Sequence, residues 1–204
     1  MTRFYILRHA ETSWNLEGNR YCGRTDIPLS PTGREQAQWA AHALREVPFA
    51  AAFCSPLQRS RETATIIAGE RGLSPACDAL LLEVDFGAWE GLTRGEIETT
   101  DPAGWAGWLR DPAAVRAGGT GETGQEAAAR IDRFVRDTAA VCPNETVLVV
   151  GHNTLNRLYL AASLEVPLRN YRRLVQGNTG INVLELADGE PRWVQINETA
   201  HLRR

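Results

Sequence analysis

The chain has 204 residues, 43% of them hydrophobic, which is enough for one globular domain with a full core and too few for two domains of ordinary size. Its net charge of −3 at pH 7 gives no basis for nucleic-acid binding, and no apolar run approaches the ~20 residues needed to cross a membrane. All 22 basic residues are arginine, which excludes the lysines of P-loop, Schiff-base and protein-kinase sites.

The cysteines and histidines indicate no metal or redox centre. Cys22, Cys54, Cys77 and Cys142 form no C-x-x-C pair, and the four histidines show no metal-ligand spacing. We therefore expect no metal and no cofactor. The N-terminus lacks a signal-like segment, so we expect a cytoplasmic protein with no membrane or nucleic-acid partner. The oligomeric state stays open between a monomer and a homodimer.

In the first half of the chain, apolar runs alternate with helical patterns. The first apolar run ends on Arg8 and His9, and Ser30 or Thr32 can cap the first helix. The predicted elements are a strand from residue 4 to Arg8, a polar loop over 11–31, a helix to about residue 46, a strand over 49–54 and a helix over 57–72.

The second half continues this alternation and ends in a hairpin around Asp188-Gly189. The patterns predict a strand over 80–84, helices over 93–100, 125–141 and 154–163, a strand over 146–150, and antiparallel strands over 181–186 and 192–196. Residues 101–124 are rich in glycine and proline, and we expect a lid or insertion there, within a single domain spanning 1–204. The fold class is therefore α/β, with a mostly parallel sheet and an antiparallel edge.

Two local patterns do not carry a function. A G-x-G-x-x-G sequence lies at residues 119–124, but no apolar strand precedes it, so the dinucleotide-binding interpretation lacks its context. Glu83 and Asp85 are too close in sequence for a strong glycosidase signal.

Three predicted strands carry cationic or imidazole groups where they end. Arg8 and His9 follow the first strand, Arg59 lies one turn past the second, and His152 follows the strand over 146–150. The carboxyl ends of parallel strands lie at one edge of a sheet, beside the amino ends of the following helices. These groups would then converge on a pocket suited to a phosphoryl group.

Four segments resemble, in the right order, the signatures of the histidine phosphatase superfamily, which also holds the cofactor-dependent phosphoglycerate mutases. They are Leu7-Arg8-His9-Ala10-Glu11-Thr12 with Trp14-Asn15 and residues 23–30, Ser55 to Ala64, Glu83 to Gly91, and Gly151-His152-Asn153 with Arg157 and residues 176–179. The resemblance covers residues 4–186 and implies a three-layer α/β/α sandwich of the phosphoglycerate mutase type. Residues 23–30 are similar to α-ribazole phosphatases and related broad-specificity phosphatases.

Two positions depart from the usual family pattern. Ala10 stands where the family usually has Gly, as in some branches, and an added methyl group there is compatible with the chemistry. Cys22 stands where Gln is frequent, so the polar contact to substrate at that position is not assured.

The resemblance implies a role for each matching residue. His9 would be the nucleophile that forms a phosphohistidine, and Glu83 would protonate the leaving alcohol and later activate water. Arg8, Arg59 and His152 would hold the phosphoryl oxygens. The remaining predicted substrate or phosphate contacts are Asn15, Cys22, Gly23 and Asn153, with Phe86 and Trp89 as an apolar wall or as ordinary core residues.

The resemblance implies a metal-independent phosphomonoesterase that acts on a small phosphorylated metabolite. Hydrolysis is favoured over mutase-type transfer because mutases in the family are longer and enclose the substrate. A non-catalytic phosphate-binding regulator is a further alternative. Trp105 and Trp108, with Tyr21, Arg110 and Arg116, would line a lid over the substrate, or else the tryptophans pack in the core.

Overall fold

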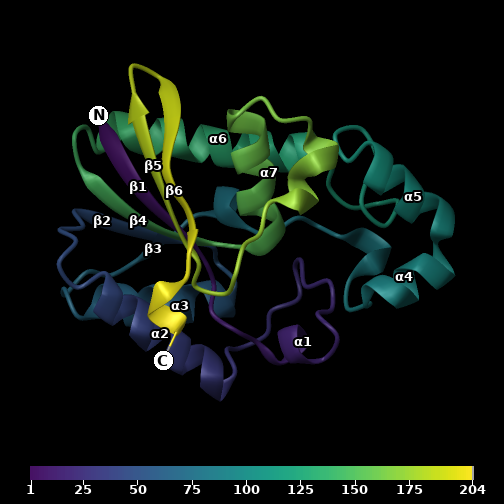
Figure 1. Ribbon diagram of the computed structural model, residues 1–204, viewed down its shortest axis with the longest axis horizontal. Helices are drawn as coiled ribbons and strands as arrows, with labels where there is room; N and C mark the ends of the chain where they lie inside the picture. Colours follow the sequence, from purple (N-terminus) through teal and green to yellow (C-terminus); the bar gives the residue numbers. More distant parts are fainter. Residues whose placement is uncertain (204) are drawn as a thin grey trace.

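The computed structural model describes residues 1–203, which form one mixed six-stranded sheet in the order β3-β2-β4-β1-β5-β6 (Figure 1). The strands that pair in parallel come first in that order, and β5 and β6 add an antiparallel hairpin to β1. Their bounds are β1 Thr2–Arg8, β2 Ala51–Cys54, β3 Ala76–Cys77, β4 Thr146–Gly151, β5 Ile181–Ala187 and β6 Glu190–Glu198. The predicted sheet, mostly parallel with an antiparallel edge, is confirmed.

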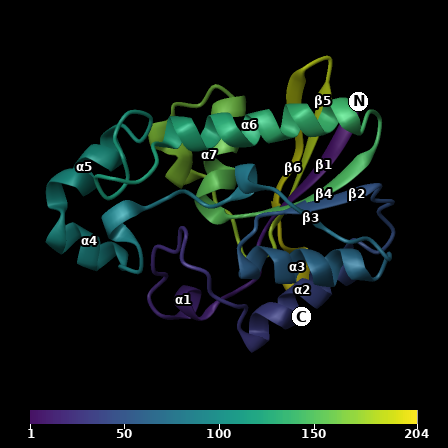
Figure 2. The same cartoon turned by 180° about the vertical axis from the view of Figure 1, so that it is seen from behind.

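Helices cover both faces of this sheet, which gives the predicted three layers. In Figures 1 and 2, α2 and α3 lie on one face, α6 and α7 lie on the other, and α4 and α5 extend beyond the end of the sheet. The helices are α1 Ser13–Leu16, α2 Pro31–Ala43, α3 Gln58–Gly69, α4 Arg94–Thr100, α5 Pro102–Arg110, α6 Gly124–Val141 and α7 Asn153–Ser163, and short 3₁₀ turns span Ala79–Leu81, Gly87–Trp89, Leu168–Arg173 and Ala200–Leu202. None of the helices within residues 1–203 is long and apolar enough to span a membrane.

The two-residue period of β1 divides the core into two. Phe4 and Ile6 are fully buried in the cluster that contains the α6 and α7 side chains, whereas Leu7 is fully buried in the cluster beneath α2 and α3. Strand β4 alternates in the same way, with Val149 on the first side and Val150 on the second. Both central strands are therefore buried on both faces, as expected of a parallel sheet covered by helices.

Local capping explains why the predicted helices begin where they do. The Ser30 hydroxyl accepts a hydrogen bond from the Gly33 N–H at 2.9 Å, and Pro31 occupies the first turn of α2. Thr123 and Glu126 form a capping box at the start of α6. The predicted loop over 11–31 also contains one helical turn, α1, which begins after Thr12.

The strand predicted over residues 80–84 is wrong. Leu81 and Val84 are fully buried, but the Asp78 carboxylate accepts a hydrogen bond from the Leu80 N–H and caps a 3₁₀ turn there instead. The strand at the parallel edge of the sheet is β3, which is two residues long and lies shortly before this turn. The side chains of a short apolar run can be buried equally well in a strand or in an irregular segment. The apolar pattern alone therefore does not distinguish these two conformations.

Residues 101–124 are more regular than expected, because α5 occupies Pro102–Arg110. Asp101 caps this helix by accepting from the Gly104 N–H, and Pro102 lies in its first turn, where proline is tolerated. Trp105 and Trp108 are 4% and 0% exposed and pack in the core. A lid role for the whole segment stays a prediction.

Candidate active site

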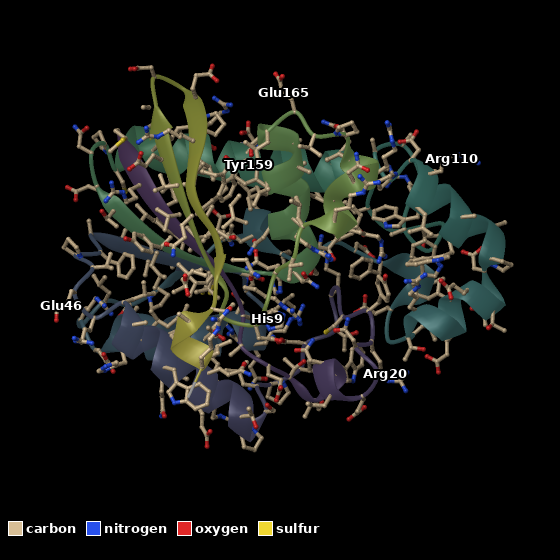
Figure 3. The ribbon with its side chains drawn as sticks, in the orientation of Figure 1. His9, Arg20, Glu46, Arg110, Tyr159 and Glu165 are labelled. Carbon is tan, nitrogen blue, oxygen red and sulfur yellow. The ribbon has the colours of Figure 1, made fainter. Side chains whose placement is uncertain are left out.

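The carboxyl ends of β1 and β4 bring two histidines together. Arg8 is opposite Gly151 in the parallel register, and the His9 N–H donates to the Gly151 carbonyl at 3.0 Å. As a result the imidazole rings of His9 and His152 lie 5.3 Å apart, centroid to centroid, at an interplanar angle of 59°. Figure 3 shows His9 between the sheet and the loop that carries α1.

The His9 imidazole has one ring nitrogen hydrogen-bonded to the backbone and the other free within residues 1–203. Its side chain is buried, and its Nδ1 lies 2.7 Å from the Ala10 carbonyl oxygen, which can only accept, so Nδ1 carries the proton and Nε2 has a free lone pair. Burial and the neighbouring Arg59 and Arg8 guanidinium groups hold the pKa of His9 well below its usual value. The imidazole is therefore uncharged at neutral pH.

His152 presents both ring nitrogens without a partner. It is fully buried and stands at the N-cap of α7, and neither nitrogen has a hydrogen-bond partner within residues 1–203. Burial, Arg59 and His9 lower its pKa well below the ordinary value for histidine. Buried polar groups are rarely left unpaired, so these nitrogens indicate a site for a polar ligand.

Arg8 and Arg59 supply the positive charge, from different directions. Arg8 donates to the Gln176 carbonyl at 3.0 Å, and burial together with Arg157 lowers the Arg8 pKa to about 10. Arg59 is fully buried at the start of α3, and its terminal nitrogens donate to the carbonyls of Cys22, Gly23 and Thr25 at 2.9–3.1 Å. The Nε atom of each arginine is buried without a partner in the described part of the chain.

Glu83 lies at the amino end of α7. One carboxylate oxygen accepts from the Leu155 and Val84 N–H groups, both at 2.9 Å, and the other accepts from the Thr154 N–H at 3.0 Å. The first N–H groups of a helix lack partners within the helix, and their partial positive charge attracts a carboxylate. This contact fixes Glu83, which is 4% exposed, beside His152.

These groups open onto a cavity of about 310 Å³. It is strongly cationic, with five arginines and one carboxylate among its lining residues. The cavity is lined by Arg8, His9, Thr12, Asn15, Gly18, Asn19, Arg20, Tyr21, Cys22, Glu83, Phe86, Arg94, Asn153, Thr154, Arg157, Tyr171 and Arg172.

The predicted site residues do not all reach this cavity. Those that line it are Arg8, His9, Asn15, Cys22, Glu83 and Asn153. Arg59 and His152 are fully buried and do not line it, but Arg59 donates to the carbonyl of the lining residue Cys22, and the His152 ring lies 5.3 Å from that of His9. Gly23 does not line the cavity, and its N–H donates to Glu90 at 2.9 Å, so it is not free for a ligand. Burial raises the pKa of the Cys22 thiol to about 11, so this side chain stays uncharged.

Some cavity residues were not expected from the sequence. Arg172 has the appearance of a solvated surface residue in the run Arg169 to Arg173, yet it lines the cavity with Tyr171. Trp105, Trp108 and the two arginines expected with them in a lid, at positions 110 and 116, do not line the cavity. Within residues 1–203 no group of three or more His, Cys, Asp or Glu side chains is arranged to hold a metal ion.

Comparison with known proteins places this geometry in a family. The family model described as Histidine phosphatase superfamily (branch 1) matches residues 4–199. Phosphoserine phosphatase 1 of Hydrogenobacter thermophilus is 30% identical over 202 residues, which cover 99% of this chain and 95% of that protein. The Bifunctional protein Rv2228c of Mycobacterium tuberculosis is 36% identical, and the match spans 98% of this chain but 55% of that longer protein.

Solved structures show the same fold. The Bacillus stearothermophilus protein YhfR superposes with a TM-score of 0.92 at 30% identity, covering 100% of both chains. Phosphoserine phosphatase from Entamoeba histolytica, solved in complex with 3-phosphoglyceric acid, superposes with a TM-score of 0.90 at 30% identity over 99% of this chain and 100% of that one.

Proposed function

The chain belongs to the histidine phosphatase superfamily, and from this premise we propose that it hydrolyses phosphate monoesters of small metabolites through a phosphohistidine on His9. The observation that carries the proposal is the pair of buried imidazoles, His9 and His152, whose pKa values are both lowered beside Arg8 and Arg59. One neutral ring with a free lone pair can attack phosphorus while cationic groups and the other ring bind its oxygens.

The reaction takes two steps. First, His9 Nε2 attacks phosphorus, the bond from phosphorus to the alcohol oxygen breaks, and Glu83 gives its proton to that oxygen. Second, Glu83 takes a proton from a water molecule whose oxygen attacks phosphorus, the phosphorus–nitrogen bond breaks, and inorganic phosphate leaves. Proton transfer by such a positioned group typically contributes 10²–10⁴-fold to rate. Glu83 ends the cycle in the protonation state in which it began.

Charge stabilisation comes from the groups around His9. In the transition state, negative charge is spread over the three equatorial phosphoryl oxygens, and fixed donors in a site shielded from water stabilise it strongly. Arg8 lines the cavity, Arg59 and His152 are neighbours of His9, and all three have buried nitrogens that lack partners within residues 1–203. These residues therefore supply donors and positive charge without a metal ion.

The size of the cavity and the relatives support a small substrate. A volume of about 310 Å³ is within the range of cavities that bind small molecules. One relative is named phosphoserine phosphatase 1, and one structural neighbour was solved with 3-phosphoglyceric acid. A cytoplasmic location remains the prediction made from the sequence.

Product analysis with 3-phosphoglycerate tests this function. Purified protein, with EDTA present, is expected to release inorganic phosphate from 3-phosphoglycerate and from p-nitrophenyl phosphate. A mutase would instead form 2-phosphoglycerate faster than inorganic phosphate once 2,3-bisphosphoglycerate is added. Saturable phosphate binding with no turnover of either ester would identify a non-catalytic binder and reject the proposal.

A further inference from the structure

Three of the five arginines that line the cavity have no acidic partner within residues 1–203: Arg8, which adjoins His9, and the neighbours Arg157 and Arg172. Arg20 and Arg94 line it too, but they form ion pairs with Glu96 at 3.2 Å and Glu98 at 2.7 Å. For the partly buried Arg157 and Arg172, no carboxylate within residues 1–203 lies at ion-pairing distance. A partly buried positive charge normally has a counter-ion. We therefore expect Arg157 and Arg172 to bind a negatively charged group of a ligand.

Aromatic side chains hold both guanidinium groups in place. The Arg172 guanidinium carbon lies 4.6 Å from the Trp105 ring centroid and 5.5 Å from that of Tyr171, and the Arg157 carbon lies 5.1 Å from the Tyr171 centroid. Arg172 also donates to the Tyr21 hydroxyl, and its Nε is buried without a partner among the described residues. Fixed guanidinium forks suit a planar carboxylate or a phosphate, because little side-chain freedom is lost on binding.

The positive charge of Arg172 disfavours the charged form of Arg157. Burial lowers the pKa of Arg157 and the neighbouring Arg172 lowers it further, whereas Tyr171 and Glu83 act in the opposite sense. The pKa of Arg172 is raised instead, because its contacts with Tyr171 and Tyr21 outweigh its burial. An anion between the guanidinium groups would remove this repulsion and replace the lost solvation. The free energy that it costs to hold the two guanidinium groups close together is thus recovered when an anion binds between them.

Arg157 and Arg172 line the same cavity as His9, so they can bind the molecule that His9 attacks. Arg157 is on α7, whose N-cap is His152, and its Nε donates to the Asn153 carbonyl at 3.2 Å. Five residues along a helix correspond to a rise of about 7.5 Å, and Arg157 lines the same 310 Å³ cavity as His9. A small phosphate monoester bound in this cavity can therefore contact His9, Arg157 and Arg172.

We propose that Arg157 and Arg172 form a second anion subsite that selects phosphate monoesters carrying a carboxylate or a further phosphate on the alcohol. This proposal rests on the function proposed above and names its substrate class. An ammonium group on the substrate would need a free carboxylate in the cavity. Within residues 1–203, the one carboxylate that lines the cavity is Glu83, which already accepts three backbone hydrogen bonds. The site therefore favours 3-phosphoglycerate over zwitterionic phosphoserine.

Matched substrates test the subsite in the wild-type protein. The esters are 3-phosphoglycerate, glycerol 3-phosphate, in which a hydroxymethyl group replaces the carboxylate, propane-1,3-diol bisphosphate, and phosphoserine. Charged hydrogen bonds of about 1.5–3 kcal/mol predict about a 10–100-fold higher kcat/KM for 3-phosphoglycerate than for glycerol 3-phosphate. A still higher value for the bisphosphate would identify a second phosphate as the natural anion. Equal values for all four esters would overturn the proposal.

Variants assign the preference to these side chains. In Arg157→Gln and Arg172→Gln, the ratio of kcat/KM for 3-phosphoglycerate to that for glycerol 3-phosphate is expected to fall about tenfold or more, chiefly through KM. The control is Arg110→Gln, because Arg110 is exposed at the end of α5, does not line the cavity and lies far from His9 in Figure 3. An equal loss on both esters would mean a structural role and reject the subsite.

Equilibrium binding keeps the two proposals separate. If the wild-type protein turned over none of these esters, the proposed function would fail, and calorimetric titration would then decide the subsite alone. The subsite predicts that 3-phosphoglycerate binds more tightly than glycerol 3-phosphate and that Arg172→Gln removes the difference. Equal affinities in the wild-type protein would reject the subsite whatever the outcome for catalysis.

Discussion

The imidazole rings of His9 and His152 lie with their centroids 5.3 Å apart, although the two residues are far apart in the sequence. Parallel pairing of β1 with β4 brings them together, since Arg8 is opposite Gly151 in the register. Both rings are buried next to arginines, which lowers both pKa values. A site with two uncharged imidazoles amid fixed positive charge is suited to an anion that must be attacked by nitrogen.

Replacing His9, the proposed nucleophile, should remove activity without unfolding the protein. We expect His9→Ala to lower kcat for p-nitrophenyl phosphate by at least about 10³-fold, because no other side chain takes over covalent attack. The matched control is His42→Ala, a histidine exposed on α2. Steady-state kinetics and circular dichroism check both variants, and near-normal turnover by His9→Ala would show that His9 is not the nucleophile.

Glu83→Gln should separate substrates by the basicity of their leaving groups. Alcohols of high pKa need a proton as they leave, so glycerol 3-phosphate is expected to lose about 10²-fold more in kcat/KM than p-nitrophenyl phosphate does. Glu46→Gln serves as the control, since Glu46 is exposed and far from His9 in Figure 3. Equal losses on both substrates would remove the acid role from Glu83.

The buried histidines should make stability depend on pH. Their pKa values are lowered in the folded protein, so below about pH 6.5 the unfolded chain binds protons that the folded chain does not. The free energy of unfolding is therefore constant with respect to these groups above that pH and falls as the pH drops below it. Each histidine contributes a slope of up to about 1.4 kcal/mol per pH unit.

Urea unfolding at pH 7.5 and pH 5.5 measures this dependence. Comparison of the wild-type protein with His152→Asn isolates one histidine, because all other groups titrate in both proteins. We expect the variant to lose less stability on acidification than the wild-type protein loses, whatever its stability at pH 7.5. Identical losses would mean that His152 takes up its proton in the folded state.

Arg59→Lys should be harmful although it keeps the charge. The Arg59 guanidinium binds three carbonyl oxygens in the loop from Cys22 to Thr25, and a lysine ammonium lacks the fork that reaches all of them. We expect at least about a 10²-fold loss in kcat/KM and a loss of about 1–3 kcal/mol in the free energy of unfolding. Arg61→Lys, on the exposed side of the same helix, is the control. Activity within a few-fold of wild type would contradict this dual role.

The sequence predicted the parts of the site that depend on local order along the chain. Arg8 and His9 end a strand, Arg59 opens the helix after a strand, and His152 follows the central strand β4, so their convergence follows from parallel pairing. The motifs around them also predicted the family, which the match over residues 4–199 confirms.

Features that depend on tertiary contacts could not be predicted in this way. The apolar run over 80–84 became a capped turn, because side-chain burial does not require the backbone to pair in a sheet. In the sequence, Arg172 has the pattern of a surface residue. It lines the cavity because its guanidinium group packs against the rings of Trp105 and Tyr171. Gly23 matched a family motif, yet its N–H is occupied by Glu90.

Trapping the covalent intermediate tests the account most directly. A radiolabelled phosphate ester is mixed rapidly with the protein, quenched in alkali, and digested for mass spectrometry. We predict label that is stable in alkali, lost in acid, carried by the peptide that contains His9, and absent from His9→Ala. Full turnover by the wild-type protein with no label on that peptide at any quench time would contradict attack by His9.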